Sequence, residues 1–139
     1  MNPKSLIISI VVAFLVIFGT DYLIHGVWLV PAYHATSWLW RPDAEMGSHM
    51  GWLIGGQLLA AATFVLIWAR GFAATATPTC GLIYGACMGA FSQVHAIISY
   101  AVSPISLGIA ARWFGSGVLQ AVLLGFIVSR VYRPLKDAR

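Results

Sequence analysis

Charge is what this sequence lacks most. Only 9% of its 139 residues are Asp, Glu, Lys or Arg, whereas 60% are hydrophobic. A soluble domain is about one-quarter charged. The 8 basic and 4 acidic side chains of this chain cannot cover the surface of a soluble body of its length. The composition therefore excludes an ordinary soluble domain and predicts a chain surrounded by lipid.

Cysteine and the common catalytic motifs are also scarce or missing. The two cysteines, Cys80 and Cys87, are too few for a disulfide framework, so we interpret both as small packing residues. The chain has no G-x-S-x-G, H-E-x-x-H, C-x-x-C or Walker motif, which makes an enzyme the less favoured hypothesis. Its basic residues sit mainly at the ends of apolar runs, so we expect no nucleic-acid partner.

Long apolar runs are what the sequence does have. Four of them are long enough to cross a hydrocarbon core of about 30 Å. They cover residues 6–30, 52–69, 82–102 and 109–129. The first contains Asp21 and His25 and is too long for the core of a signal peptide, so we expect it to be retained. The prediction is one all-α, multi-pass membrane domain over residues 1–139, folded as a four-helix bundle.

The positions of Lys and Arg predict an orientation. Only Arg41 and Arg112 lie in the connections on one side of the membrane. The other side carries Lys4, Arg70, Arg130, Arg133, Lys136 and Arg139. Because short cytoplasmic connections are enriched in basic residues, we expect both termini to be cytoplasmic.

Two segments of the chain resemble each other. Residues 18–31 align with residues 91–104 without a gap, matching a Phe and a Pro, and each segment precedes a helix that contains a Gln, Gln57 or Gln120. This pattern suggests two tandem helical hairpins related by a pseudo-two-fold axis along the membrane normal. Convergence between apolar helices explains the match equally well, so both interpretations stay open.

Small residues recur at spacings of three and four along the third run. They are Gly81, Gly85, Gly89, Ser92, Ala96, Ser99 and Ser103. Such a stripe allows close approach of two backbones in lipid and predicts a helix contact face. The partner can be a helix of the same bundle or one of another subunit, and we expect a homo-oligomer or a larger membrane complex.

Four polar side chains are predicted to share one depth in the bilayer. Because a central Asp costs about 2.5–3.5 kcal/mol in a membrane helix, Asp21 needs polar partners. His25 follows it by four residues on the same helix face, so the two can hydrogen-bond or share a proton. With Gln57 and His95 they form our predicted ligand-binding pocket, which would take a small molecule, an ion or a proton. Gln120 lies near the midplane.

Three alternatives compete with this pocket. The polar residues can be structural, holding the bundle together by hydrogen bonds. His25 and His95, on different helices, can also bind a haem axially, although no c-type attachment motif is present. Finally, the outer connection carries His34, Met46 and His49, with Asp43, Glu45 and Met50 nearby, a set that could hold copper but has no fixed ligand spacing. The sequence leaves the cofactor open.

The order of these motifs resembles a known group of proteins. It runs Asp21-Tyr-Leu-Ile-His25-Gly-Val-Trp, then Trp-Arg-Pro-Asp-Ala-Glu45-Met, then Trp52-x-x-x-Gly-Gln57, then Gly85 and Tyr100-x-x-x-Pro104. The order resembles small bacterial four-helix membrane proteins that form a domain of unknown function, and it covers nearly the whole chain. The resemblance implies a bacterial inner-membrane location and brings no activity with it. We expect a binding protein whose role can be related to transport. The alternatives are an accessory or scaffold subunit of a larger membrane complex and a haem- or metal-binding redox subunit.

Overall fold

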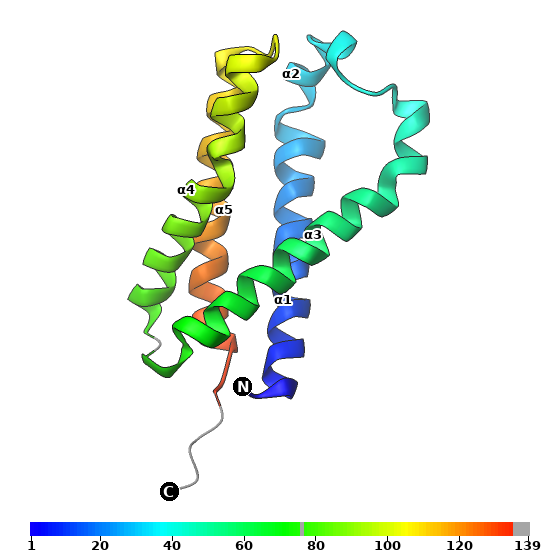
Figure 1. Cartoon of the computed structure of the whole chain (residues 1–139). Coiled ribbons are helices and arrows are strands. Elements are labelled where there is room, and N and C mark those ends of the chain that lie inside the picture. Colours follow the sequence, from blue (N-terminus) through cyan, green and yellow to red (C-terminus); the bar gives the residue numbers. More distant parts are fainter. Residues whose placement is uncertain (76, 135–139) are drawn as a thin grey trace, which may run out of the picture.

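The computed structural model describes residues 1–75 and 77–134, and every regular element in them is a helix (Figure 1). The long helices are α1 (Pro3–Leu23), α3 (Asp43–Gly71), α4 (Pro78–Val102) and α5 (Leu107–Val131). A π-helical turn (Ile24–Trp28) and the short α2 (Val30–His34) follow α1. Lys136 and Arg139 of the predicted cytoplasmic tail lie outside the described residues.

Four helical segments are long and apolar enough to cross a membrane. They are Pro3–Trp28, Asp43–Gly71, Pro78–Val102 and Leu107–Val131. Large apolar side chains such as Ile7, Leu59 and Leu119 are exposed on their outward faces, where lipid tails would solvate them. The predicted all-α four-helix bundle is confirmed, and the length and composition of its four long helices suit a multi-pass membrane protein.

Capping residues set where three of the helices begin. The side chains of Asn2, Thr77 and Ser106 accept hydrogen bonds from backbone N–H groups in the first turns of α1, α4 and α5. Proline follows Asn2 and Thr77 at the first helical position, where its missing N–H costs nothing.

The start of α3 differs from the sequence-based prediction. The helix begins at Asp43 rather than Trp52, with Asp43 and Glu45 in its first turn, where their charge favours the positive end of the helix dipole. The prediction counted only apolar residues, and a helix that extends beyond the hydrocarbon region need not be apolar. Most of the outer connection, predicted as a loop, is therefore helical.

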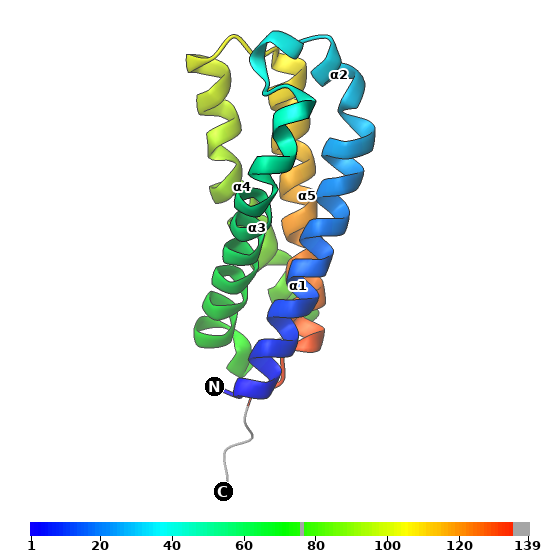
Figure 2. The same ribbon diagram turned by 90° about the vertical axis from the view of Figure 1, so that its right-hand side faces the viewer.

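The helices pack mainly as two consecutive pairs. α1 contacts α3 and α4 runs along α5, while α1 also contacts α5 and so joins the two pairs (Figure 2). This connectivity is that of two tandem hairpins. The N-terminus and the end of α5 lie at the same end of the bundle, which we call the proximal end; the opposite end is the distal end.

The small-residue stripe of α4 faces α5. A Cβ atom added at Gly81 would lie 2.5 Å from the carbonyl oxygen of Gly125, and one at Gly85 would collide with the backbone carbonyl of Ala121. Real Cβ atoms do not approach backbone this closely, so the contact requires glycine. The stripe is a helix contact face, and α5 of the same chain occupies it.

The proximal half of the bundle has a closed core. The ring of Tyr84 on α4 packs against Phe64, Trp68 and Phe72, with ring centroids 4.6, 5.4 and 5.0 Å away. Its hydroxyl donates a hydrogen bond of 2.6 Å to the backbone carbonyl of Phe64. These contacts hold α3 against α4 at this end.

The distal half is more open. Here α3 leans away from α4 (Figure 1). A Cβ atom added at Gly51, Gly55 or Gly56 of α3 would meet nothing within 4 Å. These three glycines are therefore not packed against another element, and Gly56 lines a polar cavity.

Candidate binding site between the helices

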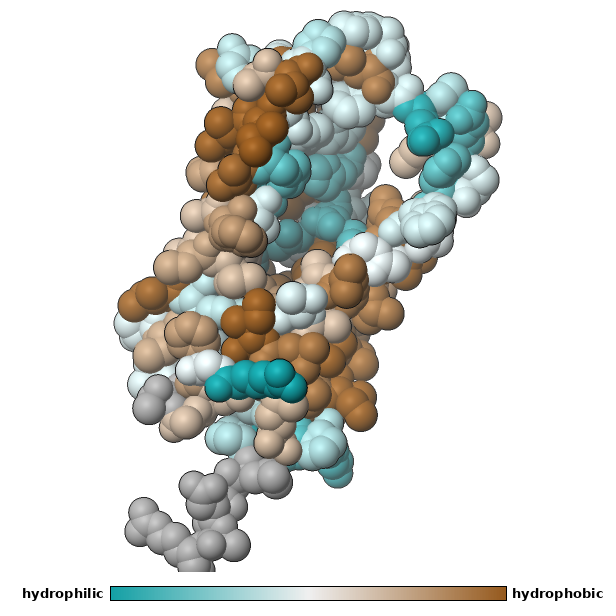
Figure 3. Space-filling view, in the orientation of Figure 1, coloured by the Kyte–Doolittle hydropathy of each residue, from teal (hydrophilic) through white to brown (hydrophobic). Residues whose placement is uncertain are grey.

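A cavity of about 540 Å³ lies between the four long helices. Its polar lining comes from every one of them and includes Asp21, His25, Gln57, His95 and Gln120. Figure 3 shows a hollow between α4 and the distal part of α3, with hydrophilic residues gathered in it. We call this space the Asp21 cavity.

The carboxylate of Asp21 is held by amides from two other helices. Gln57 Nε2 on α3 donates to Oδ2 at 2.6 Å, and Gln120 Nε2 on α5 donates to Oδ1 at 2.7 Å. Both oxygens of the Asp21 side chain are acceptors in this arrangement. No Lys or Arg of the described residues lines the cavity or pairs with Asp21. The carboxylate is therefore hydrogen-bonded but has no basic partner.

The two glutamines differ in how fully their amides are used. Gln120 Nε2 also donates to Thr20 Oγ1 at 2.6 Å, and that hydroxyl donates in turn to the carbonyl of Val16. Gln57 Oε1, in contrast, is buried and has no hydrogen-bond partner among the described residues. The Gln57 side of the site thus contains one unsatisfied polar atom next to the carboxylate.

His25 lies in the π-helical turn and contacts a different partner. The turn is marked by the hydrogen bond from Leu29 N to the Ile24 carbonyl at 2.8 Å, and such turns often occur at functional sites. His25 Nδ1 lies 2.6 Å from the hydroxyl of Tyr33, which also accepts a hydrogen bond of 2.8 Å from Trp113 Nε1. Since the hydroxyl has one proton, it can accept from Trp113 and donate to His25.

The rings of Tyr33, Trp40 and Trp113 continue from the His25 ring as one layer of aromatic contacts, which we call the wall. The ring of Tyr33 stacks on His25 and meets Trp40 edge-on, with centroids 5.2 Å apart in the second contact, and Trp40 lies 5.9 Å from Trp113. Burial raises the pKa of the Tyr33 hydroxyl above its usual value. His25 and Trp113 line both the Asp21 cavity and a second, distal cavity of about 780 Å³. The wall therefore separates two adjoining cavities.

His95 on α4 has a defined protonation pattern. Its Nδ1 lies 2.7 Å from the carbonyl oxygen of Ser92, which can only accept, so Nδ1 carries the proton. In the neutral ring the other nitrogen, Nε2, is then an acceptor. Nε2 has no hydrogen-bond partner in the described part of the chain, and the side chain is exposed and lines the cavity.

The structure places the four residues of the predicted pocket around this one cavity. Asp21, His25, Gln57 and His95 all line it. The predicted bond between Asp21 and His25 is not formed in the described residues, because Asp21 bonds to the two glutamines and His25 to Tyr33. Sequence reasoning missed three contributors, which are Gln120, Tyr33 and Trp113. The match of Gln120 to Gln57 in the proposed repeat was a usable signal for the first.

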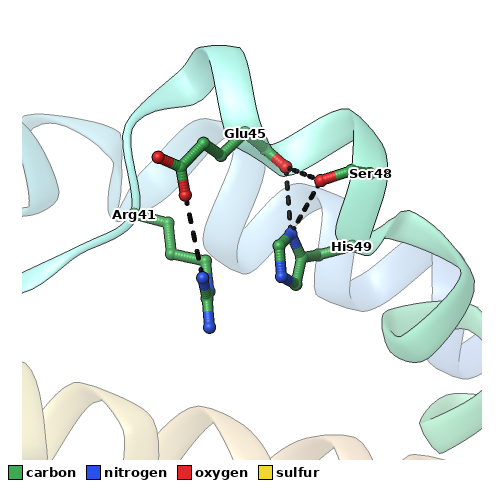
Figure 4. A network of polar contacts seen from close by, with 4 residues as sticks. All are labelled: Arg41, Glu45, Ser48 and His49. Carbon is green, nitrogen blue, oxygen red and sulfur yellow. Dashed lines mark hydrogen bonds and ion pairs between the residues drawn. The ribbon is translucent and has the colours of Figure 1, made fainter.

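Of the candidate copper ligands in the outer connection, His34 and Met46 line the distal cavity together with Asp43, whereas His49 does not line it. His34 lies in α2, whereas Met46 and His49 lie in the first turns of α3. His49 Nδ1 lies 3.0 Å from both the Glu45 carbonyl oxygen and Ser48 Oγ, and Arg41 pairs with Glu45 at 3.7 Å. Figure 4 shows these contacts within the start of α3 and with Arg41, which lies just before it. No group of three or more His, Cys, Asp or Glu side chains within residues 1–75 and 77–134 could hold a metal ion.

Comparisons of the chain with family models, with curated proteins and with solved structures find no match. Function depends on the chemistry of a site rather than on a fold. For this chain the candidate site is the Asp21 cavity.

Proposed function

We propose that the chain is a bacterial cytoplasmic-membrane protein, with both termini cytoplasmic, that binds a small molecule, an ion or a proton in the Asp21 cavity. The observation that carries the proposal is a carboxylate without a basic partner at the wall of a cavity of about 540 Å³. Intramembrane acids are costly and concentrate at binding sites and ion or proton pathways.

A purely structural role for Asp21 accounts less well for the same contacts. A structural polar network is favoured when every member is satisfied, whereas Gln57 Oε1 is buried without a partner. An unsatisfied buried group costs about 1–3 kcal/mol. A structural network also needs no adjoining cavity. Because Ser9 Oγ and Trp68 Nε1 are also buried without a partner among the described residues, the adjoining cavity is the feature that supports a ligand site.

Access to the cavity supports a role in binding or transport. The proximal half is closed by the aromatic contacts of Tyr84, while the distal half is open between α3 and α4. One-sided access is expected for a binding protein, and also for one state of a carrier that alternates its access. The cytoplasmic assignment of the termini would place the opening on the outer side of the membrane.

The alternative functions have less support. The stripe around Gly85, assigned to a partner helix in the accessory-subunit hypothesis, is occupied by α5 of the same chain. In the haem hypothesis His25 and His95 would be the axial ligands through Nε2, since Nδ1 of each ring is hydrogen-bonded, and the hypothesis rests on these two residues alone. A visible absorption band in the purified protein would restore the haem hypothesis.

The proposal is tested by what remains bound after purification. The wild-type protein, Asp21→Asn and Glu45→Gln are purified in mild detergent, and native mass spectrometry with metabolite analysis identifies the bound species. Glu45 is a matched control because it is an exposed acid that lines neither cavity. We expect a bound species in wild type and Glu45→Gln that is absent from Asp21→Asn. An empty wild-type protein, or the same species in all three, contradicts binding of a small molecule or an ion and leaves only a proton as the ligand.

A further inference from the structure

The charge of the Asp21 cavity limits what it can hold. Its lining contains one carboxylate and no Lys or Arg of the described residues. The ion pair between Arg41 and Glu45 lies on exposed side chains outside this lining. An anionic ligand would face the Asp21 carboxylate without a compensating Lys or Arg in the lining, which low dielectric makes unfavourable.

Two groups of the cavity, Asp21 and His95, offer free hydrogen-bond acceptor positions. An ionised carboxylate offers about four lone-pair positions, and the two glutamine amides each use one at Asp21. His95 Nε2 is a second acceptor without a partner in the described residues. A ligand that bonds to both must supply N–H or O–H donors. An ammonium group has three donors and a positive charge.

Thr63, Ser92, Gln93 and Ser116 also line the cavity, but most of the remaining lining is apolar or aromatic. Phe64, Phe91 and Trp113 line the cavity, together with Met88 and Leu124. Aromatic faces attract a cation within about 6 Å, and apolar side chains favour a hydrocarbon body. A cavity of about 540 Å³ is also in the range of small-molecule sites, about 300–1,000 Å³. A bare metal ion would leave this apolar lining unused and would find one carboxylate.

From these observations we infer that the ligand of the Asp21 cavity is an organic ammonium ion, a protonated primary or secondary amine on an apolar body. Its N–H groups donate to Asp21 and His95, and its body lies against the aromatic lining. This inference rests on the proposed function, since it names the ligand class of the same site.

Three probes of matched shape separate charge from shape. Benzylammonium, ethylbenzene and phenylacetate share a benzyl group and end in a cation, a neutral methyl group and an anion. Their binding is measured by titration calorimetry on the full chain in lipid nanodiscs at neutral pH, with empty nanodiscs as the blank. We expect benzylammonium to bind one site per chain and more tightly than either of the other probes.

Two variants and one control assign the binding to the site. Asp21→Asn should weaken benzylammonium binding at least tenfold, and His95→Leu should weaken it several-fold. His95 is exposed and bonds only to its own helix, so its replacement does not disturb packing. Glu45→Gln should leave the affinity unchanged. Thermal unfolding of each variant verifies that it is folded.

The outcomes separate the two proposals. Equal or tighter binding of ethylbenzene or phenylacetate overturns the ammonium inference, as does unchanged benzylammonium binding in both variants or its absence from the wild type. If a species of another class co-purifies with the wild type but not with Asp21→Asn, the proposed binding function survives and the ligand class is wrong.

Discussion

Gln57 and Gln120, on helices of different pairs, donate to opposite oxygens of the same carboxylate at 2.6 and 2.7 Å. The carboxylate belongs to Asp21 on α1, the helix that contacts both α3 and α5. The hydrogen bonds to Asp21 and the packing of α1 therefore join the same three helices, α1, α3 and α5. In lipid such interhelical hydrogen bonds supplement packing, and here they also position the wall of the cavity.

Replacing Asp21 by Asn should leave stability nearly unchanged. The Asn side chain keeps one acceptor for Gln120 and gains an N–H group, which the buried Gln57 Oε1 can accept after its amide turns over. We expect thermal unfolding in detergent to shift by no more than about 0.5 kcal/mol in free energy, the range of a neutral substitution.

Asp21→Leu is the contrasting variant for this prediction. It leaves two buried amide donors without an acceptor, so a loss of about 1–3 kcal/mol is expected in the same assay. Should Asn destabilise the protein as much as Leu does, the unsatisfied Gln57 oxygen is not available to accept, and the variant is unsuitable for binding tests.

The membrane helices and part of the site could be predicted because both follow from the free-energy cost of placing a local segment in the wrong solvent. Long apolar runs require lipid, and an acid such as Asp21 within one requires polar partners at its own depth. The choice among partners could not be predicted, because it depends on helix rotation. The π-helical turn turns His25 toward Tyr33, and nothing in the sequence around Gly26 specifies that turn.

Alanine at Gly85 should destabilise the α4–α5 contact. The added Cβ would collide with the carbonyl of Ala121, and overpacking of this kind costs about 1–3 kcal/mol. Gly115→Ala is the matched control, since a Cβ there meets nothing within 4 Å. We expect a lower unfolding temperature for Gly85→Ala and no loss for the control. Equal behaviour of the two variants would mean that α4 and α5 are not in close contact.

Phenylalanine at Tyr84 should weaken the closed proximal core. The Tyr84 hydroxyl donates to the Phe64 carbonyl at 2.6 Å, and the ring is only 4% exposed. Removing the hydroxyl keeps the ring contacts and deletes one buried hydrogen bond, worth about 1 kcal/mol. Tyr100→Phe, at an exposed tyrosine, should have no effect on thermal unfolding. If Tyr84→Phe also has none, the hydroxyl does not join α3 to α4.

The stability of the protein should fall in alkaline solution partly because of Tyr33. Burial is the largest cause of its raised pKa, and the carboxylate of Asp21 adds to it. Since the folded protein disfavours the phenolate, the unfolded chain loses this proton first as pH rises above the ordinary value of 10.0. The free energy of unfolding then decreases with pH until the folded pKa of Tyr33 is passed.

Tyr33→Phe removes this ionisation and isolates its contribution. The variant should be less stable at neutral pH, because Trp113 Nε1 and His25 Nδ1 lose their partner, yet its stability should fall less steeply above pH 10.0 than that of the wild type. Thermal unfolding followed over this pH range tests the slope, with Tyr100→Phe as the control for losing a tyrosine. The difference in tyrosinate absorbance between wild type and Tyr33→Phe gives the folded pKa directly. A midpoint at or below 10.0 in that difference would mean that the wall between the two cavities does not bury the Tyr33 hydroxyl.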